Sequence, residues 1–239
     1  RAVLKFRISH SKTGEPVNDL QILHERALHT FIVHEDLSTF SHTHHEDYKH
    51  LDEQTLERAE FEFPYEFPKA GRYFIVNEFT HQGRSWVKHF VMTTAGQSSS
   101  SIRPRDLTMQ KSVGGYRVAL RTSPSPPIAG HPVEIVCHLS DENGAPVGNL
   151  SLYLGSEVHM ASWKADGTSF GHQHTFTTAM AELMRQMQGH RMNVNQVSRR
   201  MSALMSESRN QEYFGPEVPI RHVFPTSGLY KIFLEFSPN

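Results

Sequence analysis

The chain has 239 residues, with 24 lysines and arginines against 25 aspartates and glutamates, and a formal net charge of −1. This balance of charges does not predict the basic surface that is typical of a nucleic-acid-binding protein. No apolar run approaches the roughly 18 residues that a membrane-spanning helix needs. Histidine is unusually frequent, with 17 residues, whereas the single cysteine, Cys137, has no partner for an internal disulfide and is expected in the core.

A motif in the first half of the chain recurs in the second half. Nine residues are identical at a constant offset of 130, without a gap. They are Gly14, Pro16, Val17, Leu20, His29, Asp36, Phe40, His42 and His44, matched by Gly144, Pro146, Val147, Leu150, His159, Asp166, Phe170, His172 and His174. The chain is therefore a tandem duplication, and both copies keep the spacing His-x12-His-x-His.

A second block recurs at an offset of 157, so the second copy carries 27 additional residues before it. The block reads Phe-Pro-x-x-Gly-x-Tyr at residues 67–73 and again at residues 224–230. Tyr73 and Tyr230 stand where a tyrosine fastens the corner of a β-sandwich, so we expect this block to be scaffold.

The predicted elements are short strands separated by turn residues. In the first copy they are residues 3–9, 28–34, 39–45, 59–63, 71–79 and 86–92, with no helix between them. In the second copy they are residues 117–122, 133–139, 151–154, 158–163, 169–173, 220–224 and 229–236. Regular strands of this kind predict a mainly β fold of two tandem immunoglobulin-like antiparallel β-sandwich domains.

We place the first sandwich at residues 1–95, a flexible linker at 96–112 and the second sandwich at 113–239. Residues 176–210 are predicted to form an inserted helical hairpin, because methionine and leucine recur there at helical spacing. Six of the nine methionines lie in this insertion. Thioethers are soft ligands suited to Cu(I), but a methionine and leucine stripe is better explained as the buried face of a helix.

If residues 28–34 and 39–45 form a hairpin, His29 lies opposite His44, and His42 is its diagonal neighbour on the same face. Three imidazoles then converge, and three histidines with an open position suit Zn(II), Cu(II) or Ni(II). His159, His172 and His174 repeat the pattern. We therefore expect one ion per repeat, copper by preference or else zinc.

The alternative is that these histidines are hydrogen-bonding residues retained because they pack well. Retention of all three at one spacing favours ligands. The histidines without a counterpart in the other copy are expected to be solvated or local, and Asp36 and Asp166 are expected in the hairpin turns. Those unmatched histidines include His24, His34, His45, His50, His81, His89, His190 and His222.

These landmarks together resemble the YtkA-like group of small heavy-metal-associated β-sandwich domains. The shared pattern is Gly-x-Pro-Val-x-Asp-Leu, a histidine opening a strand, Phe-x-His-x-His, and Phe-Pro-x-x-Gly-x-Tyr. The family often has a proline after the second motif histidine, where His45 and Thr175 stand here. The resemblance implies a secreted, periplasmic or cell-surface protein linked to heavy metals, copper above all.

The leading hypothesis is a non-enzymatic extracytoplasmic protein that sequesters or delivers metal. A second hypothesis is a structural or adhesive module that assembles into a filament through exposed sheet edges. This hypothesis rests on two predicted strands that occur in only one copy. The first copy lacks the opening strand of the second, and the second copy lacks the closing strand of the first. The difference predicts either that each outer domain lacks an edge strand or that the chain is part of a longer protein with further repeats. A third, a copper oxidase or monooxygenase, is disfavoured because no general acid or base recurs beside both triplets.

Overall fold

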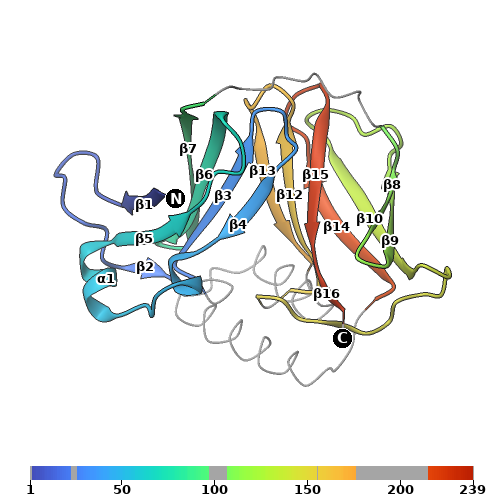
Figure 1. Ribbon diagram of the computed structural model, residues 1–239, viewed down its shortest axis with the longest axis horizontal. Helices are drawn as coiled ribbons and strands as arrows, with labels where there is room; N and C mark the ends of the chain where they lie inside the picture. The colour runs from blue at the N-terminus through green and yellow to red at the C-terminus, as the bar shows by residue number, and fades with distance from the viewer. Residues whose placement is uncertain (1, 23–25, 97–106, 155, 176–214, 239) are drawn as a thin grey trace, which may run out of the picture. The chain divides into compact units, whose positions relative to one another are not determined.

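The computed structural model describes residues 2–22, 26–96, 107–154, 156–175 and 215–238 (Figure 1). The chain divides into two compact units, Arg1–Arg103 and Pro104–Asn239. Within the described ranges both are built of antiparallel sheets, which confirms the predicted mainly β fold. No helix in these ranges has the length and apolar character to span a membrane. The helical hairpin expected at residues 176–210 lies outside the described residues.

The first unit is organised around a five-stranded sheet. β6 pairs with β3 on one side and β7 on the other, β4 pairs with β3, and β2 pairs with the end of β6 (Figure 1). These strands are β2 (Leu20–Gln21), β3 (Leu28–His34), β4 (Phe40–Thr43), β6 (Gly71–His81) and β7 (Arg84–Thr94). Their β-branched and aromatic residues explain why this sequence prefers strands.

A two-stranded sheet forms the second layer of this unit. β1 (Ala2–Arg7) pairs antiparallel with β5 (Glu60–Tyr65). The core joins the layers, and each fully buried side chain of this size contributes about 1.5–3 kcal/mol. One core cluster contains Leu4, Ile32, Phe63, Tyr73 and Ile75. The first unit is thus a sandwich in which β3 and β6 supply the larger face.

A short helical segment connects β4 to β5, where we predicted no helix. It contains the 3-10 helix η1 (His45–Asp47) and the helix α1 (Glu53–Arg58). Asp52 caps α1 by accepting a hydrogen bond from the Thr55 amide at 2.8 Å, and Ala59 ends it in the left-handed conformation. Six residues are too few to show a helical hydrophobic period, so pattern reading missed this helix.

The second unit has a four-stranded sheet, β14–β10–β9–β8, and a three-stranded sheet, β13–β12–β15. β11 pairs separately with β16. The strands are β8 (Gln110–Val113), β9 (Tyr116–Ser123), β10 (Pro132–Asp141), β11 (Leu150–Ser151), β12 (His159–Lys164), β13 (Phe170–His174), β14 (Glu217–Val223), β15 (Tyr230–Glu235) and β16 (Ser237–Pro238). Buried side chains of β10, β12 and β14 form one core cluster between the two larger sheets.

Two boundaries differ from the predictions. β8 begins at Gln110, so the last residues of the predicted linker at 96–112 belong to a strand. The predicted strand at 151–154 is wrong, because β11 ends at Ser151 and Leu154 has a positive φ of 49°. Cys137 is fully buried in the core, as expected, and burial raises the pKa of its thiol to about 12.

The two units repeat the same pairings. Leu20 opposite His81 between β2 and β6 corresponds to Leu150 opposite Pro238 between β11 and β16. The predicted tyrosine corners are present in both. The Tyr73 hydroxyl donates to the Lys69 carbonyl at 3.0 Å and Tyr230 donates to the Thr226 carbonyl at 3.0 Å. The structure therefore preserves the duplication at the level of strand register.

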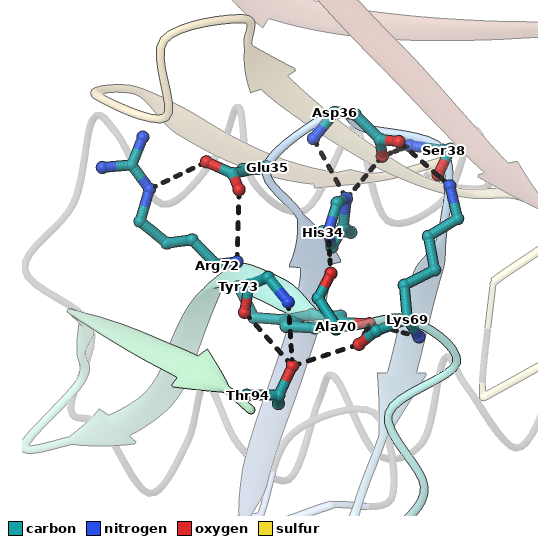
Figure 2. A network of polar contacts seen from close by, with 10 residues as sticks. His34, Glu35, Asp36, Ser38, Lys69, Ala70, Arg72, Tyr73 and Thr94 are labelled. Atoms are coloured by element: carbon teal, nitrogen blue, oxygen red, sulfur yellow. Dashed lines mark hydrogen bonds and ion pairs between the residues drawn. The ribbon is translucent and has the colours of Figure 1, made fainter. Parts of the chain in front are cut away.

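Figure 2 shows the polar network at the turn between β3 and β4. The Asp36 carboxylate accepts from the Ser38 amide at 2.9 Å and from Lys69 Nζ at 3.0 Å, and lies 2.7 Å from Nδ1 of His34. Burial opposes ionisation of Asp36, but these hydrogen bonds outweigh it and hold the pKa of the carboxyl well below its ordinary value. In the second unit Asp166 accepts from the Thr168 amide at 2.9 Å. Both aspartates thus serve the hairpin turns, as predicted.

Candidate metal centres

The hairpin registers bring each predicted histidine triplet together. Between β3 and β4, Thr30 lies opposite Thr43, and the next position along this register places His29 opposite His44. Between β12 and β13, His159 lies directly opposite His174. The predicted hairpin geometry is therefore correct in both units, and each set of three histidines could hold a metal ion.

In the first centre, three ring nitrogens form a nearly equilateral triangle. Nδ1 of His29 lies 3.1 Å from Nε2 of His42 and 3.1 Å from Nε2 of His44, and the last two atoms are 3.0 Å apart. A point about 1 Å above the plane of these atoms lies about 2.0–2.1 Å from each, which is the usual length of a metal–imidazole bond. The triangle therefore fits a small transition-metal ion bound on one side.

Asp47 orients one of these ligands. Its Oδ2 atom lies 2.9 Å from Nδ1 of His44 and 2.9 Å from the amide nitrogen of the same residue. Arg26 forms a 3.2 Å ion pair with the other carboxylate oxygen. Burial opposes ionisation of Asp47, but the hydrogen bonds from His44 and the charge of Arg26 outweigh it and lower the pKa of the carboxyl.

These contacts determine the chemistry that His44 presents to the centre. With Nδ1–H donated to the carboxylate, a neutral His44 carries a lone pair on Nε2. That lone pair faces nitrogens of His29 and His42 at 3.0–3.1 Å. Nitrogen lone pairs at this separation repel one another unless a proton or a cation lies between them. The arrangement is one that a bound metal ion stabilises.

An aromatic side chain supports the first centre from within the sheet. Phe31, which lies opposite His42 in the register, stacks on its ring with centroids 4.3 Å apart and an interplanar angle of 16°. Phe31 is fully buried, and the three histidines are also buried, with His44 only 1% exposed. This packing restricts the rotamer of His42 and gives the centre an apolar wall.

The second centre repeats the ring arrangement. The His159 and His174 rings meet edge to face with centroids 4.5 Å apart, compared with 4.9 Å for His29 and His44. Nε2 of His159 lies 2.7 Å from the carbonyl oxygen of Tyr153, so Nδ1 is the nitrogen that would bind a metal ion, as in His29. His172 and His174 are half-buried, so this centre is more open than the first.

The remaining histidines have structural surroundings, and for two of them the structure decides between the solvated and local roles that the sequence left open. His34 and His45 are 2% and 1% exposed rather than solvated. Nδ1 of His34 contacts Asp36, and Nδ1 of His45 accepts from the Glu62 amide at 3.1 Å. His222 is also buried. His50 and His89 are exposed, and Nε2 of His81 lies 2.9 Å from Oδ1 of Asp19. His24 and His190 lie outside the described residues.

Sequence reasoning missed the groups that contact the ligands from outside. These groups are Asp47, Arg26 and the carbonyl of Tyr153, and none of these residues recurs in the other copy. Comparison of the two copies therefore could not identify them. The one usable signal was the position of Asp47, three residues after His44, which itself directly follows the end of β4. An acid so placed can fold back onto the preceding histidine.

Comparison with known proteins gives a family and no activity. A family model described as "Domain of unknown function (DUF8832)" matches residues 1–96 and 111–239. The chain belongs to this family. The matched ranges fall one in each compact unit. Neither the curated proteins nor the solved structures include a match to the chain.

Proposed function

We propose that this DUF8832 protein is an extracytoplasmic copper-binding protein that holds one ion in each repeat, for sequestration or delivery. The observation that carries the proposal is the triangle of His29, His42 and His44 nitrogens, 3.0–3.1 Å apart and backed by the Asp47 carboxylate. Three imidazoles suit Cu(II) and also Zn(II). Copper is preferred here because the sequence landmarks resemble domains associated with that metal.

A binding role is proposed in preference to catalysis. Asp36 and Asp166, which match at the offset of 130, are engaged in the hairpin turns at the opposite end of the strands from the triads. Asp47, beside the first triad, contacts His44 and Arg26. Glu78 and Glu235, which match at the offset of 157, lie opposite His29 and His159 in the strand registers, so both copies keep an acid at this position. The preference for binding therefore rests on the two histidine sets, each of which could hold a metal ion.

The test is the metal content of natively purified protein, measured by mass spectrometry, with single and double substitutions. We expect about two equivalents in the wild type, one in His42→Ala or His172→Ala, and none in the double variant. His50→Ala is the matched control, because His50 is an exposed histidine outside both triads. It keeps both equivalents.

The melting temperature of each metal-free variant shows whether the fold is intact. Absence of metal from wild-type protein purified without chelators would reject the proposal. Retention of both equivalents in the double variant would reject the ligand assignment. Electron paramagnetic resonance of the loaded protein then distinguishes Cu(II) from zinc, because only Cu(II) has an unpaired electron.

A second candidate, assembly through a sheet edge, is favoured by β7. Among the described strands β7 pairs only with β6, and it carries large exposed apolar side chains. Trp86 and Val87 are 40% exposed, Phe90 46% and Val91 63%. Long edge strands with exposed apolar residues are sites of strand addition.

Sedimentation velocity at increasing protein concentration tests this candidate. Assembly predicts species larger than a monomer, and Phe90→Lys on β7 would reduce them by introducing a charge at the edge. A monomer at all concentrations would reject it. The two candidates are tested independently, since no triad histidine belongs to β7: His44 directly follows β4, and the others lie on β3, β4, β12 and β13.

A further inference from the structure

We infer that Glu78 and Glu235 are carboxylates that the two centres have in common, and that their charge makes each histidine triad favour a divalent ion over a monovalent one. The copper that the protein holds is then Cu(II). This inference rests on the proposed metal-binding function and adds to it the charge of the bound ion. Both glutamates act on the ion from outside the triad, so neither is a ligand in this account.

The first observation is that both repeats have this acid. Glu78 on β6 and Glu235 on β15 match at the offset of 157, and each is followed by a phenylalanine. The two residues before each acid differ between the copies, with Val-Asn at residues 76–77 and Phe-Leu at residues 233–234. An acid kept in both copies beside positions that have changed indicates a role that the two repeats share.

The second observation is the strand register, which places each acid beside its triad. Glu78 lies directly opposite His29 between β6 and β3, and Glu235 lies directly opposite His159 between β15 and β12. Directly opposed residues of antiparallel strands point to the same face of the sheet, with Cβ atoms about 4.5–5.5 Å apart. On the other side of each of these histidines, the register places the last histidine of its triad. Each repeat therefore has a row of histidine, histidine and glutamate across three strands.

The glutamates lie beside the metal-binding nitrogens and not among them. In each set that could hold an ion, the ligand atoms within 4.8 Å of one another are those of the three histidines. The Ser85 hydroxyl on β7 donates a hydrogen bond to Oε1 of Glu78 at 2.7 Å, which helps to hold the first carboxylate in place. Both glutamates are half-buried, so solvent screens their charge only in part.

A carboxylate in this position distinguishes ions by their charge. Three neutral imidazoles leave the charge of a bound ion uncompensated in a partly desolvated site, and a nearby negative charge offsets part of that cost. The Coulomb energy is proportional to the charge of the ion, so the same carboxylate stabilises Cu(II) or Zn(II) twice as much as Cu(I). The row of three residues therefore favours divalent ions in both repeats.

The experiment measures the affinity for ions of each charge in proteins with a single centre. His172→Ala leaves the first centre and His42→Ala leaves the second. Each protein is titrated against competing chelators with Cu(II), with Zn(II) and, under reducing conditions without oxygen, with Cu(I). Glu78→Gln is then added to the first protein and Glu235→Gln to the second, because glutamine keeps the size of the side chain and removes its charge.

We expect each glutamine substitution to weaken Cu(II) and Zn(II) binding by about 10- to 100-fold, the range associated with groups just outside the ligands of a metal. Since the effect scales with the charge of the ion, Cu(I) binding should weaken by the square root of that factor, about 3- to 10-fold. Glu134→Gln, made in the His42→Ala protein, is the matched control. Glu134 is an exposed glutamate on β10, a strand without a triad histidine, so its substitution leaves all three affinities unchanged.

Aspartate substitutions separate the effect of charge from that of structure. Glu78→Asp and Glu235→Asp keep the negative charge, so they should retain the preference for divalent ions. Equal losses of Cu(II) and Cu(I) affinity in the glutamine variants would overturn the inference, because a distorted triad weakens the binding of both ions. Loss of the preference in the aspartate variants would likewise contradict an effect of charge.

Unchanged Cu(II) affinity in either glutamine variant would also overturn the inference, because the role is assigned to both repeats. These results would leave the proposed function intact, since the two parent proteins would still bind Cu(II). Failure of both parent proteins to bind Cu(II) would overturn the proposed function and this inference with it.

Discussion

Gly171 on β13 has no side chain, and the imidazole ring of His222 on β14 occupies the space where one would lie. A Cβ atom at position 171 would lie 2.5 Å from Cε1 of His222 and 2.9 Å from Oγ of Ser162. At the repeat offsets of 130 and 157, Ser41 and Tyr65 take these two places in the first unit, and they are hydrogen-bonded to each other. Each unit thus pairs a different small residue with a different ring at the same point between its sheets.

Gly171→Ala is expected to destabilise the second unit by about 1–3 kcal/mol, because the added methyl overpacks the contact with His222. The free energy of urea unfolding measures the effect. Gly148→Ala is the control, since a Cβ atom there meets nothing within 4 Å. A double variant that also carries His222→Ala should recover part of the loss, and strict additivity would contradict a direct contact.

His222 should make the stability of the second unit depend on pH. Burial lowers its pKa from 6.5 to about 4. The neutral ring is therefore favoured in the folded state, and this contribution is present above pH 6.5 and lost as the pH falls towards 4. The loss is on the order of 2–3 kcal/mol. Unfolding measured between pH 7.5 and 4 should show a shallower decline in His222→Gln, and an identical decline would contradict the prediction.

Asp36→Asn should destabilise the first unit by about 1–3 kcal/mol, because it leaves Lys69 and His34 without their partly buried carboxylate partner. Since the pKa of Asp36 is lowered by folding, its stabilising effect is present above the ordinary pKa of an aspartate and disappears as the pH falls below it. Thermal melting at pH 7 and in acid measures both effects. Asp166→Asn is the matched change in the exposed turn of the second unit and should have the smaller effect.

The two tyrosine corners should contribute unequally to stability. The Tyr73 side chain is fully buried, and its hydroxyl both donates to the Lys69 carbonyl and accepts from the Lys69 amide at 3.0 Å. Tyr73→Phe should therefore cost about 1–3 kcal/mol. The corresponding bond of Tyr230 is exposed, so Tyr230→Phe should cost less than about 1 kcal/mol. Chemical unfolding of the two variants compares them directly, and equal costs would be contrary to this expectation.

The predictions from sequence were most accurate for features that repeat at a regular spacing along the chain. Strand residues alternate between faces, so the spacing of His42 and His44 placed them on one side, and the turn placed His29 beside them. The observed registers agree with that deduction in both repeats. The duplication strengthened this deduction, because the same histidine spacing occurs in both copies. Short or irregular elements such as α1 and β11 have no such period and were misjudged or missed.

By itself, the sequence determined the duplication, the mainly β fold and the six histidines of the two triads, because these follow from repeated residues and two-residue alternation. Only the tertiary structure decided that Asp47 and Arg26 lie behind His44, that His34 and His45 are buried, and that His222 faces Gly171. The physical reason is that these contacts depend on the paths of connecting segments and on packing between strands distant in the chain. Apart from the position of Asp47 three residues after His44, no local pattern encodes these contacts.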